Sequence, residues 1–226
     1  MPRIEWEQNY NIDIALCIDA TASMKQPIEE LKANVKKYYS MLVEAIEYID
    51  GIPERNVHVR VKVITFRDYG RDAEPMKVSR FFTIGEESEA FLEYLNGIKA
   101  YGGGDEPENG LEAIALAMKS DWVRTGFRRR HVIVVFTDAS ALPLGERANE
   151  TGYPDDIPAN FSELKDWWHG SGMERRIGRL LLLAPDEHPW KDMTDWDNTY
   201  HVCSKAGVGC DDYDLSTCIH FLTDDL

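Results

Sequence analysis

Ile12-Asp-Ile-Ala-Leu-Cys-Ile-Asp-Ala-Thr-Ala-Ser23 is an apolar stretch that ends on three side chains carrying oxygen. The apolar part predicts a buried strand, and Asp19, Thr21 and Ser23 occupy alternate positions at its carboxyl end. Carboxylates and hydroxyls are oxygen ligands of the kind that hard cations prefer. The stretch therefore predicts a buried strand whose carboxyl end can bind a cation.

The segments that follow predict a helix and then two strands. Apolar residues recur at spacings of three and four from Met24 to Ile49, which is typical of an amphipathic helix, and Gly51-Ile52-Pro53 ends it. Residues 57–64 alternate between apolar and polar side chains, as in a half-buried strand. Residues 77–82 form a second short strand with no helix before it, so we expect an antiparallel pair at a sheet edge.

A second acidic segment, Gly102-Gly103-Gly104-Asp105, precedes a helix that we expect to start near Leu111. Another helix is expected before it, over residues 87–95. Glycines allow backbone conformations that other residues rarely adopt. Asp105, with Pro107 and Glu108 after it, also fits a helix capping box, and one carboxylate could cap a helix and bind a cation together.

A third acidic segment follows the continuous apolar run Val132–Phe136, which predicts a strand buried on both faces and ends on Thr137-Asp138. Residues 139–160 have no clean periodicity, and we expect a long loop that lies over the cation site. The remaining segments predict a helix at 161–168, a strand at 179–185, a short helix at 188–190, a strand at 198–202 and a helix at 213–222.

Alternating strands and helices favour a mostly parallel sheet, in which ligands bind outside the carboxyl ends of the strands. Three separate segments place Asp19, Asp105 and Asp138 at that edge. Carboxylates brought close together repel one another unless a cation lies between them. This convergence is the strongest indication of a functional site in the sequence.

The composition limits the class of protein. The 226 residues fit one α/β domain, and 43% of them are apolar, enough for a core. A net charge of −15 argues against a nucleic-acid or membrane partner and suits a cation or a basic protein surface. No apolar run is long enough to span a membrane. The first ten residues lack the basic start and apolar core of a signal peptide, so we expect a cytoplasmic protein.

Four cysteines are too few for a disulfide framework. Cys17 lies in the first apolar run, and we expect a small core residue there. Cys203, Cys210 and Cys218 lie near two histidines without a Cys-x-x-Cys pair. Reduced thiols are the simpler interpretation, and a structural zinc site is the alternative.

From Ile12 to about Leu222 the chain resembles the von Willebrand factor A (vWA) family with its metal-ion-dependent adhesion site (MIDAS). The family motif is a strand ending Asp-x-Ser-x-Ser, a threonine in a second loop and an aspartate after a later strand. Asp19-Ala20-Thr21-Ala22-Ser23 matches the first part and Thr137-Asp138 the last. Asp105 stands where the family has threonine, and residues 102–108 resemble a subgroup with Gly-Gly-Gly-Asp-x-Pro-Glu, found in A domains attached to alpha-type kinases.

The resemblance implies a single domain over residues 1–226 with a Rossmann-like, doubly wound, mostly parallel sheet. That sheet would have six strands, one of them an antiparallel edge strand, and helices on both faces. The implied function is protein binding rather than catalysis, with a partner such as an AAA-type ATPase, a kinase or a phosphatase that presents an acidic or basic surface.

The implied cofactor is a divalent cation, magnesium before manganese or calcium. Thr21 and Ser23 would ligate it directly, and Asp19 and Asp138 directly or through water. Asp105 would add negative charge, and an acidic residue of the partner would complete the coordination.

Three alternatives stay open. A hydrolase of the haloacid-dehalogenase type would also have an aspartate at the end of its first strand, but it needs a second acid where Thr21 stands. A nucleotide-binding protein would need a Gly-x-Gly-x-x-Gly or Walker motif, which the chain lacks. The last alternative is a degenerate, metal-free scaffold.

Overall fold

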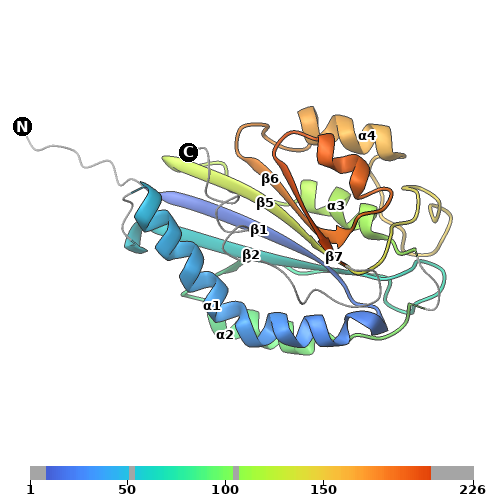
Figure 1. Ribbon diagram of the computed structural model, residues 1–226, viewed down its shortest axis with the longest axis horizontal. Helices are drawn as coiled ribbons and strands as arrows, with labels where there is room; N and C mark the ends of the chain where they lie inside the picture. The colour runs from blue at the N-terminus through green and yellow to red at the C-terminus, as the bar shows by residue number, and fades with distance from the viewer. Residues whose placement is uncertain (1–8, 51–53, 104–106, 205–226) are drawn as a thin grey trace, which may run out of the picture.

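The computed structural model describes residues 9–50, 54–103 and 107–204. They form a mixed sheet with helices on both faces, and Figure 1 shows α1 and α2 on one face and α3 and α4 on the other. The strands are β1 Tyr10–Asp19, β2 Val57–Phe66, β3 Met76–Val78, β4 Phe82–Thr83, β5 Arg128–Phe136, β6 Gly178–Pro185 and β7 Thr199–Ser204. The helices are α1 Lys25–Asp50, α2 Ser88–Gly97, α3 Gly110–Met118 and α4 Phe161–Asp166.

Shorter helical turns join these elements: 3-10 turns at Ala22–Met24, Glu54–Asn56 and Lys191–Asp195, and a π turn at Trp167–Ser171. The helix predicted for residues 213–222 lies outside the described residues. Within the described part of the chain, no helix has both the length and the apolar character that crossing a membrane requires.

The strand order β3-β2-β1-β5-β6-β7 places β1 at the centre of the sheet. β1 pairs in parallel with β2 on one side and β5 on the other, so that Asp19 lies beside Phe66 and Ile18 beside Phe136. β6 and β7 continue the parallel arrangement. The carboxyl ends of these five strands therefore meet at one edge, as the alternation of elements in the sequence predicts.

The antiparallel edge strand is also present, but it is interrupted, which gives seven strands among the described residues where six were expected. β3 pairs Val78 with Ile64, and β4 pairs Phe82 with Val61, so residues 79–81 lie opposite only residues 62–63. The buried Ser79 fills this bulge, because its hydroxyl accepts a hydrogen bond from the Val63 amide at 2.8 Å. The edge is thus one strand split by a bulge.

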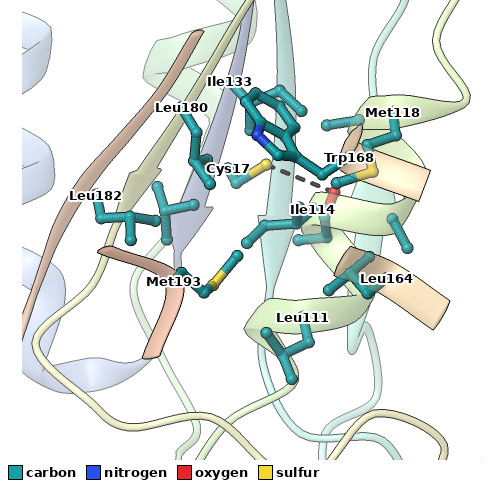
Figure 2. Close-up of a cluster of buried hydrophobic side chains, with 14 of the residues drawn as sticks. Cys17, Leu111, Ile114, Met118, Ile133, Leu164, Trp168, Leu180, Leu182 and Met193 are labelled. Atoms are coloured by element: carbon teal, nitrogen blue, oxygen red, sulfur yellow. Dashed lines mark hydrogen bonds between the residues drawn. The ribbon is translucent and has the colours of Figure 1, made fainter. Parts of the chain in front are cut away.

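Two apolar layers hold the helices to the sheet. On one face, α3 and α4 pack on β1, β5 and β6, and Figure 2 shows Cys17, Ile114 and Leu180 meeting in that layer. Cys17 is fully buried with its Sγ 3.5 Å from the Ala113 carbonyl, and burial raises the pKa of its thiol. It is the small core residue that the sequence predicted. On the other face, α1 and α2 cover β1 and β2.

Candidate metal centre

Asp19, the last residue of β1, is fully buried and accepts hydrogen bonds at both carboxylate oxygens. Its Oδ1 accepts from the Thr21 amide at 2.9 Å and from the Thr21 hydroxyl at 2.6 Å. Its Oδ2 accepts from the Thr137 hydroxyl at 2.7 Å. Asp19 is therefore held in one orientation by two loops, and neither of its oxygens lacks a donor.

Ser23 connects this group to Asp138, which follows β5. The Ser23 hydroxyl donates to Asp138 Oδ1 at 3.0 Å and lies 3.2 Å from the Thr21 hydroxyl oxygen. Asp138 Oδ2 is buried and has no hydrogen-bond partner among the described residues. The structure thus brings Asp19, Thr21, Ser23 and Asp138 together, while Asp105 lies outside the described residues.

The hydroxyl groups of this cluster lie within hydrogen-bond distance of each other. A hydroxyl carries one proton and two lone pairs. The Thr21 hydroxyl donates to Asp19 and the Ser23 hydroxyl to Asp138, and the two hydroxyl oxygens, 3.2 Å apart, keep lone pairs that can accept. A cation beside them would use these lone pairs and give the buried Asp138 Oδ2 a partner, so this set of oxygens fits a hard divalent ion.

Burial also shapes the charge of the two carboxyls. It raises the pKa of Asp19 to about 6, against the hydrogen bonds from Thr21 and Thr137, and the nearby Asp138 charge adds to the rise. Burial likewise raises the pKa of Asp138, while the hydrogen bond from Ser23 acts to lower it. Without a counterion, two ionised carboxylates are costly at this position.

The glycine segment lies directly against the Thr21 turn. Gly102 and Gly103 both have positive φ, +73° and +67°, as expected of glycines in a tight loop. A Cβ on Gly103 would lie 2.6 Å from the Thr21 Cβ and Cγ2, and the Ala22 amide donates to the Gly102 carbonyl at 3.3 Å. The absence of a side chain at Gly103 is what lets the two loops approach.

Arg67, just after β2, organises these loops and was not predicted from the sequence. It is 2% exposed, and its guanidinium donates to the carbonyls of four residues at 2.8 to 3.1 Å. Those residues are Ala20, Lys99, Tyr101 and Glu74. One guanidinium therefore connects the Thr21 turn to the segment that leads into the glycines. The sequence feature that could have indicated its role is the position of the arginine directly after a strand.

The capping interpretation of Asp105 is wrong, because α3 begins at Gly110 with Asn109 before it. Glu108 pairs instead with the loop after β5: its amide donates to the Ser140 carbonyl at 3.1 Å and its carbonyl accepts from the Leu142 amide at 2.8 Å. Because Glu108 is in this extended pairing, α3 begins only at Gly110. Asn109 bonds the turn after β2, accepting from the Tyr69 amide at 2.8 Å.

The long loop 139–160 packs on α3 and on the turn after β2. The Tyr153 hydroxyl donates to Glu112 at 2.8 Å, and Arg147 pairs with the buried Asp68 at 3.2 Å. Burial raises the pKa of Glu112. The Trp190 indole donates to the Ala139 carbonyl at 2.9 Å and anchors the start of the loop. The loop is an ordered neighbour of the Asp138 segment.

The sequence matches the family model described as the von Willebrand factor A domain over residues 13–144, more than half of the chain. The chain belongs to the von Willebrand factor A domain family. The matched residues include most of β1, the glycine segment and the strand that leads to Asp138. No curated protein shows significant sequence similarity to the whole chain.

Solved structures share this vWA fold at low identity. The pilus adhesin SpaC of Lactobacillus rhamnosus GG aligns with a TM-score of 0.56 at 14% identity over 94% of the chain. The von Willebrand factor type A protein of Catenulispora acidiphila aligns at 0.53, with 13% identity over 95%. Proximal thread matrix protein 1 of the mussel byssus, in a structure whose MIDAS holds zinc, aligns at 0.52, with 12% identity over 96%. The vWA chain spans 30%, 42% and 48% of these proteins respectively.

Proposed function

We propose that this vWA domain is a protein-interaction module that binds its partner through a divalent cation. The observation that carries the proposal is the arrangement of oxygens at the end of β1. Two hydroxyl oxygens with lone pairs to offer lie 3.2 Å apart, one of them bonded to Asp138, whose buried Oδ2 has no hydrogen-bond partner in the described part of the chain. A cation with oxygen ligands satisfies all three atoms.

Each residue has a distinct role in this proposal. Thr21 and Ser23 offer lone pairs because their protons are directed to carboxylates. Asp138 offers its Oδ2, while Asp19, with donors at both oxygens, orients Thr21 and acts through water. Magnesium suits such a set because it prefers oxygen and keeps several waters, and manganese and calcium are related candidates. A carboxylate of the partner would displace one water and complete the coordination.

The geometry argues against the hydrolase alternative. A nucleophilic aspartate needs an oxygen that a substrate can reach, but Asp19 is fully buried and Thr21 and Thr137 donate to its two oxygens. The position of a second acid is taken by Thr21, which donates to Asp19 and cannot supply a carboxylic proton. Protein binding is therefore the better-supported function. The partner classes that we propose are AAA-type ATPases, kinases and phosphatases.

Gly103→Ala should weaken the cation site through packing alone. Alanine at the positive φ of Gly103 costs about 1 kcal/mol or more, and its Cβ would displace the Thr21 side chain. We expect the magnesium affinity to fall about tenfold or more, since misplaced ligands cost binding on that scale. Calorimetry measures this, with Gly97→Ala as the control because no atom lies within 4 Å of its new Cβ. Equal affinities for both variants would contradict the packing of Gly103 on the ligand turn.

Asp105→Thr tests the departure from the common family motif. We propose that Asp105 adds a negative charge to the site, so it tightens the cation and weakens the cation's pull on a partner carboxylate. Threonine at this position should therefore lower magnesium affinity in calorimetry. Tighter magnesium binding by the variant would show that Asp105 does not strengthen the site.

The function itself is tested by capturing partners from cell extract in magnesium or in EDTA. Partners that depend on the cation should be retained by the wild type in magnesium and lost both in EDTA and with Asp19→Ala. Asp166→Ala, an exposed acid at the end of α4, is the matched control and should retain them. Partners bound equally by all variants and in EDTA would rule out cation-mediated binding.

A further inference from the structure

A second group of metal-ligating side chains lies at the edge of the sheet, at the carboxyl ends of β6 and β7. One ligand atom from each of Asp186, His201 and Cys203 lies within 4.8 Å of the other two. Asp186 directly follows β6, and His201 and Cys203 are two residues apart on β7, so their side chains leave the same face. Two paired strands thus hold all three residues in place, because His201 lies beside Leu182 and Cys203 beside Ala184.

The orientation of His201 is typical of a metal ligand. Its Nε2 lies 2.9 Å from the Ala184 carbonyl oxygen. A carbonyl oxygen only accepts, so Nε2 carries the proton and Nδ1 keeps its lone pair. Histidines that ligate metals usually donate their other ring N–H to a carbonyl or a carboxylate, which fixes the tautomer and the ring. His201 is therefore held by one ring N–H on a backbone carbonyl, as metal-ligating histidines usually are.

We propose that Asp186, His201 and Cys203 form a zinc site. A carboxylate, an imidazole and a thiolate are three ligands that Zn²⁺ takes in tetrahedral sites, and a fourth position is left for water or another ligand. Sulfur and nitrogen ligands select zinc over magnesium, so this site differs in chemistry from the all-oxygen cluster around Asp138. On binding, the Cys203 thiol releases its proton to solvent and the sulfur bonds the metal.

The surroundings of the site allow a metal to enter. Asp186 and Cys203 are exposed and His201 is half-buried. Lys191 lies 3.2 Å from Asp186 Oδ2, but both side chains are more than half exposed, and such ion pairs contribute little. A bound zinc would tie the edge strand β7 to the end of β6 and stabilise the folded chain.

Cobalt(II) titration tests the proposal, because cobalt replaces zinc and a thiolate ligand gives a sulfur-to-cobalt charge-transfer band. The cluster around Asp138 has no sulfur, and the Cys17 thiol is buried in the core, so neither should give this band. We expect the wild type and Asp19→Ala to show the band and zinc to abolish it. Cys203→Ser should remove it, and His201→Gln should weaken cobalt binding about tenfold or more.

The double variant Cys210→Ser, Cys218→Ser is the matched control for the thiols, and it should keep the band. No band in the wild type, or a band that survives Cys203→Ser, would overturn the proposal. Thermal unfolding supplies a readout independent of colour: zinc should raise the melting temperature of the wild type and not of His201→Gln. Equal zinc-induced shifts in the two proteins would also overturn it.

Discussion

Asp19→Asn should remove a pH-dependent loss of about 3 kcal/mol from the stability of the cation-free protein at pH 7, because burial raises the pKa of Asp19 to about 6 from an ordinary value of 3.8. The folded state binds the proton more tightly than the unfolded state. The contribution of protonated Asp19 to stability is therefore complete below about pH 4 and is lost as the pH rises through about 6. Asparagine stays neutral and avoids this loss.

Urea unfolding of metal-stripped protein at several pH values measures the effect. The free energy of unfolding of the wild type should fall relative to that of Asp19→Asn between about pH 4 and pH 7. Asp166→Asn, an exposed acid, should show no such trend. A difference between the wild type and Asp19→Asn that is constant over this range would contradict the raised pKa. Excess magnesium should restore stability at pH 7 in the wild type alone.

Arg67→Met should destabilise the domain by about 3 kcal/mol, because it removes four hydrogen bonds that a buried guanidinium donates to carbonyls, and hydrogen bonds to charged groups contribute about 1.5–3 kcal/mol each before solvent replaces those at the part-buried carbonyls. Two of these carbonyls belong to Ala20, beside Thr21, and Tyr101, beside the glycines. Magnesium affinity should therefore fall as well.

Denaturant unfolding and calorimetry measure these two losses. Arg80→Met is the matched control, because Arg80 is 56% exposed, and its change in stability should stay within about 0.5 kcal/mol. Arg67→Lys should also lose stability, though less than Arg67→Met, since one ammonium group cannot reach four carbonyls. If Arg67→Met lost no more stability than Arg80→Met, the hydrogen bonds of Arg67 would not stabilise the domain.

The sequence predicted the central features of this vWA domain because they depend on local pattern. Apolar periodicity located β1, α1 and β5, and the position of Asp19 and Asp138 after parallel strands predicted that they would converge. The absence of a helix between residues 57–64 and 77–82 predicted an antiparallel edge, as did the resemblance, but the bulge at Ser79 was missed. The bulge depends on the Ser79 hydroxyl, which accepts from the Val63 amide in place of a backbone carbonyl. The period of apolar residues does not reveal such a replacement.

Two features of the site depend on contacts between distant segments. The capping interpretation of Asp105 was wrong because Glu108 pairs with the loop after β5, a pairing more than 30 residues away in the chain. Arg67 was missed because the sequence does not distinguish a buried arginine that donates to backbone carbonyls from one in solvent. Two interpretations remain predictions: Asp105 as a cation ligand, and loop 139–160 as a cover for the cation.

The central claim, that the oxygens of Thr21, Ser23 and Asp138 bind a divalent cation, is tested most directly by magnesium calorimetry on metal-stripped protein. Asp138→Asn is the sharpest variant, because it preserves an acceptor for Ser23 and replaces the buried Oδ2 that has no hydrogen-bond partner among the described residues. The wild type should bind one magnesium ion at this cluster, and Asp138→Asn should not. Absence of magnesium binding by the wild type at millimolar concentration, or equal binding by the variant, would contradict the account.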